Sequence, residues 1–320
     1  MIKIIVLNKM LKPEHRQKIE DTAKGLGAEV FFTEEEKDIP EDLAEAEIMY
    51  GYGLDTARTN KNLKWLCIPY AGCDALMKPD SFANKDCILT NSSGAYGVTI
   101  AEHMIAVSLM MMRNLTDVYE ESLGGIWGPQ RPQRSLKDSR ITVLGTGDIG
   151  TSFAKRVKAF EPASVTGISR SGINTDPVYD KVLKTEDLDS VLPCTDLLAM
   201  SLPGTPETRN ILSKDRIARL PEGSFVVNVG RGSAIDEDAL ADALESGHLA
   251  GAALDVFGTE PLPGSSRLWK TKNLLITPHV AGNLTLEHTL NKNVDMFCNN
   301  LKNYMEGKPL TNLVDRTKGY

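Results

Sequence analysis

Three ionisable side chains follow three separate apolar segments in the second half of the chain. They are Arg231, Glu260 and His279. The segments that precede them are Phe225–Gly230, Ala252–Phe257 and Leu274–Pro278. Short apolar runs of this length are typical of buried strands, and in open α/β sheets ligands bind at the carboxyl ends of the strands. We therefore expect the three side chains to share one cleft.

These residue types suit the reversible reduction of a 2-oxo acid. A histidine can give a proton to a carbonyl oxygen near neutral pH, so His279 is the expected acid/base. A neighbouring carboxylate orients the ring and favours its protonated form, which is the role expected of Glu260. Arg231 would bind the substrate carboxylate and polarise the carbonyl group. Taken singly, an Arg or Glu is usually solvated surface and a lone His is often structural, but their order and spacing favour a joint site.

A dinucleotide loop is expected between a short strand, Arg140–Leu144, and a helical stretch, Thr151–Phe160. The connecting residues have the pattern G-x-G-x-x-G and are Gly145, Thr146, Gly147, Asp148, Ile149 and Gly150. The first glycine permits a tight turn, the second lets the backbone approach a pyrophosphate, and the third lets the helix pack on the strand. The alternative is an ordinary glycine-rich turn. Asp255, which ends a later strand, is expected to bind the nicotinamide carboxamide.

The next strand, Ser164–Ile168, predicts the choice of cofactor. In NAD-binding proteins an acidic residue at this strand end binds the ribose hydroxyls. Here the strand is followed by Ser169, Arg170 and Ser171. A guanidinium with two hydroxyls can bind a 2′-phosphate, so NADP(H) is expected over NAD(H). The alternative is NAD(H), with Asp176 or Asp180 reaching the ribose.

The elements around these loops predict an α/β protein. Up to about residue 90, short apolar runs alternate with Glu-, Lys- and Ala-rich stretches such as Pro13–Gly25 and Pro40–Ala46, which favour helix. The expected strands are Ile2–Leu7, Glu29–Phe32, Glu47–Gly51, Lys64–Ile68 and Cys87–Thr90. A long apolar run, Val98–Arg113, predicts a buried helix that joins two domains. A second alternation runs from Arg140 to about Val280, and a helix is expected over 286–305.

Composition excludes several classes of function. The 320 residues suggest roughly two domains of about 150 residues. The net charge of −7 offers no attraction for nucleic acid or for a membrane surface. No apolar run approaches the ~20 residues of a membrane helix, so a cytoplasmic protein is expected. The five cysteines lack metal-ligand spacing and are expected to be reduced, buried thiols, so no metal site is expected.

In its ordered motifs the chain resembles the D-2-hydroxyacid dehydrogenase family, which includes glyoxylate/hydroxypyruvate reductases and phosphoglycerate dehydrogenases. The matching elements are Ala71–Asp74, Thr99–His103, Gly145–Gly150, Leu202-Pro203 with Thr208, Asn228–Gly232, Asp255–Phe257 with Glu260-Pro261, and Thr277–Gly282. The resemblance implies that Arg231, Glu260 and His279 are catalytic and that the backbone amides of Ala71 and Gly72 bind the substrate carboxylate. The expected substrate-binding residues are thus Ala71, Gly72, Arg231 and His279. It also implies further cofactor-binding residues, namely Leu202, Pro203, Thr208, Val229, Gly230 and Gly282.

The resemblance implies two doubly wound parallel-sheet domains, a Rossmann coenzyme domain (102–284) inserted in a flavodoxin-like substrate domain (1–101 and 285–320). It further implies a homodimer through the coenzyme domains and reduction of a small 2-oxo acid, of glyoxylate or hydroxypyruvate type, to the D-2-hydroxy acid. The alternatives are a D-3-phosphoglycerate dehydrogenase, for whose substrate phosphate Arg58, Lys64 and Lys78 are candidates, and a catalytically silent dinucleotide sensor.

The remaining histidines and tryptophans are assigned more ordinary roles. His103 is expected to pack or hydrogen-bond in the connecting helix, and His15 and His248 to lie at the surface. His288 follows the catalytic loop closely enough to be a minor candidate for the cleft. Trp127 and Trp269 are expected to be apolar anchors, with a loop tryptophan from a partner subunit over the substrate pocket as the alternative.

Overall fold

The computed structural model describes residues 1–43 and 45–316, which form two compact units. Unit 1 contains Met1–Tyr96 together with the chain from Asn283 onward, and unit 2 is the continuous segment Gly97–Gly282. The boundaries expected from the sequence, after residues 101 and 284, lie a few residues from these. Positions 317–320 of the expected substrate domain lie outside the described residues.

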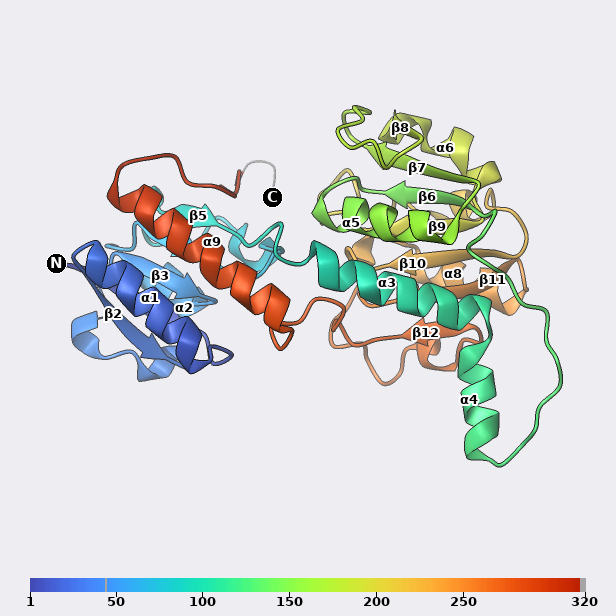
Figure 1. Cartoon of the computed structure of the whole chain (residues 1–320), viewed down its shortest axis with the longest axis horizontal. Coiled ribbons are helices and arrows are strands. Elements are labelled where there is room, and N and C mark those ends of the chain that lie inside the picture. Colours follow the sequence, from blue (N-terminus) through green and yellow to red (C-terminus); the bar gives the residue numbers. More distant parts are fainter. Residues whose placement is uncertain (44, 317–320) are drawn as a thin grey trace. The chain divides into compact units, whose positions relative to one another are not determined.

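Unit 1 is built on a five-stranded sheet with the order β2-β1-β3-β4-β5 (Figure 1). All neighbouring strands are parallel, and the order is that of flavodoxin. The strands are β1 Ile2–Leu7, β2 Ala28–Thr33, β3 Ile48–Gly51, β4 Trp65–Cys67 and β5 Ile88–Thr90. The helices are α1 Pro13–Gly25, α2 Leu54–Thr59 and α9 Glu287–Met305. The flavodoxin-like architecture expected for the first part of the chain is therefore confirmed.

The two ends of the chain complete the core of unit 1 together. Helix α9 packs beside α1 (Figure 1). Its Phe297 ring stacks on Tyr50 of β3 at a centroid distance of 4.5 Å and on Trp65 of β4 at 5.6 Å. All three rings are fully buried. Because each ring buries a large apolar area, α9 is an integral part of this unit.

Two expectations for unit 1 are wrong. His15 is buried, because it lies on the face of α1 that packs against α9, where its Nε2 is 2.7 Å from Asn291 Oδ1. The helix expected over Pro40–Ala46 is reduced to a single 3-10 turn, Glu41–Leu43; residue 44 lies outside the described residues. Helix propensity alone does not sustain so short a segment without an apolar face to pack.

Unit 2 contains a seven-stranded parallel sheet with the order β12-β11-β10-β9-β6-β7-β8. The order from β8 to β11 is that of the Rossmann fold, and β12 is one extra strand at the edge. The strands are β6 Arg140–Leu144, β7 Ser164–Ser169, β8 Lys181–Lys184, β9 Leu197–Met200, β10 Ser224–Asn228, β11 Leu249–Leu254 and β12 Leu274–Ile276. The helices are α3 Gly97–Met112, α4 Leu115–Leu123, α5 Asp148–Val157, α6 Leu188–Val191, α7 Lys214–Ile217 and α8 Glu237–Glu245.

Helix α3 is the long apolar helix expected from the sequence. It packs along α5 and contacts β10 and β11 (Figure 1), which explains why Ile100, Ala101 and Met104 are buried. In the described residues no helix is long and apolar enough to cross a membrane. None of the five cysteines forms a disulfide, and four are buried; Cys194 is exposed, contrary to expectation, because it lies in a short surface turn before β9.

Helix α4 and the chain after it leave an apolar surface on unit 2. Figure 1 shows α4 extending away from the sheet, followed by a long loop. The apolar side chains exposed here are Leu115, Val118, Tyr119, Leu123, Ile126 and Trp127. Trp127 is fully exposed, so it is not an anchor within its own chain as expected. Trp269 is about half exposed and donates its indole N–H to the Pro263 carbonyl oxygen at 2.9 Å.

Candidate active site

The glycine-rich loop lies between β6 and α5, where the strand order of unit 2 reverses. Gly145 has φ = +102°, which L-residues with a side chain rarely adopt. A Cβ on Gly150 would lie 1.9 Å from the Gly145 carbonyl oxygen, so the third glycine is required for close packing. A Cβ on Gly147 would meet no atom within 4 Å and would enter open space at the start of α5. The loop thus has the geometry of a backbone cradle for a pyrophosphate at a helix N-terminus.

Thr146 and Asp148 of this loop lie against the starts of helices. The Thr146 carbonyl oxygen accepts the Thr151 hydroxyl at 3.0 Å. Asp148, the first residue of α5, directs its carboxylate toward Gly97 at the start of α3, where a Cβ on Gly97 would lie 2.5 Å from Oδ1. Two helix N-termini therefore flank this carboxylate, which is a favourable position for a negative charge.

Strand β7 extends one residue further than expected and ends at Ser169, followed directly by Arg170 and Ser171. Ser169 Oγ accepts the Gly172 N–H at 3.1 Å, and Ser171 Oγ accepts the Ile173 N–H at 3.3 Å, so the two hydroxyls organise the turn. A hydrogen bond from the Thr205 hydroxyl lowers the pKa of Glu207, and the nearby Arg170 guanidinium adds to this lowering.

The two carboxylates considered for NAD are paired with lysines. Asp176 is 2.7 Å from the Lys155 ammonium and accepts the Val178 N–H. Asp180 binds Lys158 and accepts the Val165 N–H at 2.6 Å, at the amino end of β7. Asp180 therefore lies at the opposite end of that strand from Ser169.

Neighbouring loops pack closely around the strand ends. Thr208 Oγ1 donates to the Pro203 carbonyl oxygen at 2.7 Å and accepts the Thr205 N–H at 2.9 Å, which fixes the loop that follows β9. A Cβ on Gly230 would lie 2.6 Å from the backbone N and O atoms of Leu202. Val229, which donates its N–H to the Met200 carbonyl oxygen, completes this contact between the loops after β9 and β10.

Arg231 stands between two glycines that allow these close approaches. A Cβ on Gly232 would lie only 1.9 Å from the backbone carbon of Phe257. Asn228 Nδ2 donates to the Arg231 carbonyl oxygen at 2.9 Å, and Arg231 Nη1 donates to the Gly230 carbonyl oxygen at 2.7 Å. The loop of Arg231 is therefore in backbone contact with the loop that leads to Glu260.

Glu260 and His279 meet as expected. Glu260 Oε2 is 2.6 Å from His279 Nδ1, and Glu260 Oε1 accepts the Phe257 N–H at 2.8 Å. The His279 side chain remains 52% exposed, which leaves its ring accessible on unit 2. Because the carboxylate accepts the Nδ1 proton, Nε2 is the nitrogen available for proton transfer to another molecule.

Asp255 fastens the loop that carries His279. Its carboxylate, 3% exposed, accepts hydrogen bonds from the Thr277 hydroxyl at 2.6 Å and from the backbone N–H groups of Val280 and Ala281 at 2.9 and 3.0 Å. Its carbonyl oxygen accepts the His279 N–H at 2.9 Å. These bonds hold His279 at φ = +53°, a conformation uncommon outside glycine. The contact of Asp255 with a nicotinamide carboxamide stays a prediction.

In unit 1 the turn formed by Tyr70, Ala71 and Gly72 has its carbonyl groups engaged on one side. The Tyr70 oxygen accepts the Ser92 N–H at 3.0 Å, and the Ala71 oxygen accepts Asn91 Nδ2 at 2.9 Å. In a trans peptide the N–H points opposite to the preceding carbonyl. The amides of Ala71 and Gly72 therefore point away from Asn91 and Ser92.

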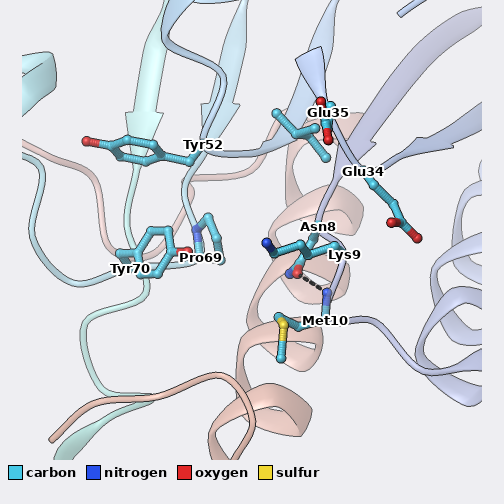
Figure 2. A pocket seen from close by; sticks show the side chains of 9 residues that line it. Asn8, Lys9, Met10, Glu34, Glu35, Tyr52, Pro69 and Tyr70 are labelled. Carbon is cyan, nitrogen blue, oxygen red and sulfur yellow. Dashed lines mark hydrogen bonds between the residues drawn. The ribbon is translucent and has the colours of Figure 1, made fainter. Parts of the chain in front are cut away.

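A pocket of about 250 Å³ lies beside this turn (Figure 2). It opens at the carboxyl ends of β1 and β3, the position where the strand order of unit 1 reverses. Figure 2 shows Tyr52 and Tyr70 on one side and Glu34 and Glu35 on the other. The remaining lining residues are Leu7, Asn8, Lys9, Met10 and Pro69.

Sequence reasoning did not assign a role to Thr277 or to Asn228, although both belong to the matching motifs. Thr277 connects Asp255 with His103, whose Nε2 is 3.3 Å from the Thr277 hydroxyl oxygen. The position of Thr277 two residues before His279 was the available signal. Among the described residues no group of three or more His, Cys, Asp or Glu side chains could hold a metal ion.

Comparison with known proteins identifies the family. Residues 105–281 match the model of the D-isomer specific 2-hydroxyacid dehydrogenase, NAD binding domain. A crystal structure of a D-isomer specific 2-hydroxyacid dehydrogenase family protein from Aeromonas salmonicida superposes with a TM-score of 0.88 at 30% identity, covering 98% of this chain and 99% of that one. The chain belongs to the D-isomer specific 2-hydroxyacid dehydrogenase family.

Two further relatives carry a named activity. The glyoxylate/hydroxypyruvate reductase A of Salmonella paratyphi C is 28% identical over 266 residues, which are 81% of this chain and 83% of that protein. The NADPH-dependent glyoxylate/hydroxypyruvate reductase of Sinorhizobium meliloti, solved with NADP and sulfate, has 25% identity and a TM-score of 0.82, with full coverage of both chains. The protein is accordingly an NAD(P)-dependent oxidoreductase of the 2-hydroxyacid class.

Proposed function

We propose that this protein reduces a small 2-oxo acid of the glyoxylate or hydroxypyruvate type to its D-2-hydroxy acid, with NADPH as the preferred reductant. The observation that carries the proposal is the 2.6 Å contact between Glu260 and His279 Nδ1, on a loop adjacent to that of Arg231. A bound nicotinamide coenzyme supplies the hydride. The chain itself must supply a proton, a cation for the substrate carboxylate, and the cradle for the coenzyme.

His279 is the proposed proton donor. Since Nδ1 is bound to Glu260, the ring is held with Nε2 free to give a proton to the carbonyl oxygen of the substrate. Arg231 binds the substrate carboxylate through its planar guanidinium group and polarises the carbonyl. The amides of Ala71 and Gly72 are proposed to bind the same carboxylate, and the pocket beside them is proposed to take the substituent of the 2-oxo acid.

The test of this mechanism is His279→Asn. Asparagine keeps a polar side chain of similar size and cannot act as a general acid, so kcat should fall at least ~100-fold, the lower end of acid/base contributions. Fluorescence titration should show NADPH binding unchanged. An unaltered kcat would exclude His279 as the proton donor, and a wild-type protein without turnover on any 2-oxo acid would favour the dinucleotide sensor.

The NADPH preference rests on Arg170. It follows β7 where an acid would serve NAD, and the alternatives Asp176 and Asp180 are engaged with Lys155 and Lys158. A charge-assisted hydrogen bond is worth about 1.5–3 kcal/mol, so Arg170→Ala should lower kcat/KM for NADPH by about ten- to a hundredfold and leave NADH nearly unaffected. Lys181→Ala, a cation at the amino end of neighbouring β8, is the matched control. A wild-type preference for NADH would refute this part.

Substrate choice favours a simple reductase over a phosphoglycerate dehydrogenase. Lys64 lies just before β4, at the opposite end of that strand from Ala71, and pairs with Glu47 at 3.1 Å. Arg58 lies 4.0 Å from Asp55. Of the three cations considered for a substrate phosphate, two are therefore engaged elsewhere. Steady-state rates should be higher with hydroxypyruvate than with 3-phosphohydroxypyruvate, and the reverse order would overturn this choice.

We also propose a cytoplasmic homodimer formed through unit 2. The support is the apolar surface of α4 and the following loop, where Leu123 is 71% exposed and Trp127 is fully exposed. Exposed apolar patches rimmed by polar residues mark protein interfaces. Analytical ultracentrifugation should give twice the chain mass, and a monomer at micromolar concentration would contradict the proposal.

A further inference from the structure

A series of hydrogen bonds leads from helix α3 to the loop that carries His279. His103 lies on α3, and its Nε2 is 3.3 Å from Thr277 Oγ1. Thr277 Oγ1 is 2.6 Å from Asp255 Oδ1. The Asp255 carboxylate in turn accepts the N–H groups of Val280 and Ala281, the two residues after His279, while its backbone carbonyl oxygen accepts the N–H of His279. His103 is thus connected through the side chains of Thr277 and Asp255 to the backbone of the two residues that follow His279.

The direction of each proton in this series can be assigned from the chemistry of the groups. An ionised carboxylate only accepts, and a threonine hydroxyl has one proton to donate. Thr277 therefore donates to Asp255, and its oxygen must accept from His103 Nε2. It follows that His103 carries a proton on Nε2. Burial lowers the pKa of His103 against the opposing charge of Asp255, so the ring is neutral at pH 7 and its proton is on Nε2 rather than Nδ1.

This connection matters because hydrogen bonds hold the loop in a conformation its backbone does not prefer. His279 has φ = +53°. If the Thr277 hydroxyl could rotate away from Asp255, the carboxylate would lose one of its three donors. The loop would then gain freedom next to the reacting nitrogen. Misplacement of a reacting group by 1 Å can cost a reaction about a hundredfold.

We propose that His103 is a positioning residue, which donates its Nε2 proton to Thr277 and thereby keeps Thr277 and Asp255 in the arrangement that orients His279. The proposal rests on the proposed function of His279 as proton donor. It assigns His103 no contact with substrate or coenzyme. Its effect should therefore appear in kcat rather than in binding.

The first test compares His103→Leu with His103→Gln. Leucine removes the donor, while the glutamine amide can place an N–H near the position of Nε2. Loss of one neutral hydrogen bond corresponds to a change of up to about tenfold. We expect kcat to fall about five- to tenfold in His103→Leu, with the substrate KM and the NADPH affinity within twofold of wild type, and to recover to within twofold in His103→Gln.

The matched control is Ser108→Ala on the same helix. Ser108 is buried and donates to the Met104 carbonyl oxygen at 2.7 Å within α3. A change in α3 packing alone would affect Ser108→Ala and His103→Leu alike, and glutamine would give no recovery. That pattern would overturn the proposal.

The second test asks whether the effect passes through Thr277. Thr277→Val removes the hydroxyl that joins His103 to Asp255. In the double variant, His103→Leu should lower kcat by less than a further twofold, because the connection is already broken. Full additivity of the two kcat effects would overturn the proposal. If the leucine variant does not fold, the same cycle can be run with His103→Ala, which also removes the donor.

The third measurement needs no substitution. NMR of protein labelled with 15N-histidine distinguishes the two neutral tautomers, and His103 should carry its proton on Nε2. A proton on Nδ1 would overturn the proposal. If His279→Asn lowers kcat and His103→Leu does not, only this inference fails. If His279→Asn leaves kcat unchanged, the proposed function fails first.

Discussion

Asp255→Asn is the substitution whose effect can be worked out most fully from the structure. The Asp255 carboxylate accepts three hydrogen bonds, from the Thr277 hydroxyl and from the N–H groups of Val280 and Ala281. An asparagine has one acceptor oxygen and a donor NH2 group in place of the second oxygen. In the better orientation the oxygen serves Thr277 and Val280, and the NH2 group faces the Ala281 N–H. One donor is then left unsatisfied, and the two remaining bonds lose their charge assistance.

A hydrogen bond to a charged group contributes about 1.5–3 kcal/mol, so unit 2 should lose roughly 2–4 kcal/mol of stability. For a unit of this size that corresponds to about 5–10 °C in Tm. Because the loop of His279 is loosened, kcat should also fall, by more than tenfold. Differential scanning calorimetry and steady-state kinetics with NADPH are the assays. Asp238→Asn, whose side chain is 85% exposed, is the control and should leave both quantities unchanged. An Asp255→Asn protein with the wild-type Tm and kcat would refute the reasoning.

Three further predictions concern other parts of unit 2. Gly232→Ala places a Cβ 1.9 Å from the Phe257 backbone and should abolish turnover by displacing the Arg231 loop, as steady-state assays of the purified variant would show; wild-type kcat would contradict the close approach. Leu123→Glu should convert a dimer to a monomer in analytical ultracentrifugation, and an unchanged mass would remove α4 from the interface. Burial raises the pKa of Glu237, so its ionisation destabilises the fold as pH rises from the usual value of 4.5 through the raised one. Glu237→Gln should therefore have a higher Tm than wild type at pH 7 and an equal Tm below pH 4, and a lower Tm at pH 7 would contradict this sign.

The sequence predicts best those features that depend on local backbone geometry. The turn at Gly145 and the close packing at Gly150 follow from the absence of a side chain, and both are found where the motif places them. The meeting of Glu260 and His279 follows from parallel strands that end at the same edge of a sheet. These inferences need only strand order and residue type, which the motifs supply.

Contacts made across the fold were not accessible in this way. The burial of His15 depends on helix α9, which is about 270 positions away in the chain. Within the sequence of α1 alone, His15 has the neighbours of an exposed residue. The bonds from Asp255 to the N–H groups of Val280 and Ala281 involve backbone atoms, which every residue has. Neither residue type nor spacing distinguishes such a carboxylate from one that faces a ligand.

The exposure of Trp127 shows a different kind of limit. Tryptophan side chains are largely buried on average. A tryptophan in an apolar loop is therefore expected to anchor that loop to the core of its own chain. In this chain its surroundings, α4 and the following loop, carry their own exposed apolar side chains. A pattern of apolar residues predicts that a surface will be buried. It does not predict whether the residues that bury it belong to the same chain.

The position of α9 has a consequence for how the protein is made. Unit 2 is one uninterrupted segment, so all of its strands have left the ribosome once Gly282 has emerged. Unit 1 begins to be synthesised first and is completed last, because Tyr50 and Trp65 stay uncovered until Phe297 has been translated. During that interval the nascent amino-terminal sheet lacks the helix that covers these aromatic rings. A premature stop codon before α9 would leave a complete unit 2 attached to a unit 1 that lacks part of its core.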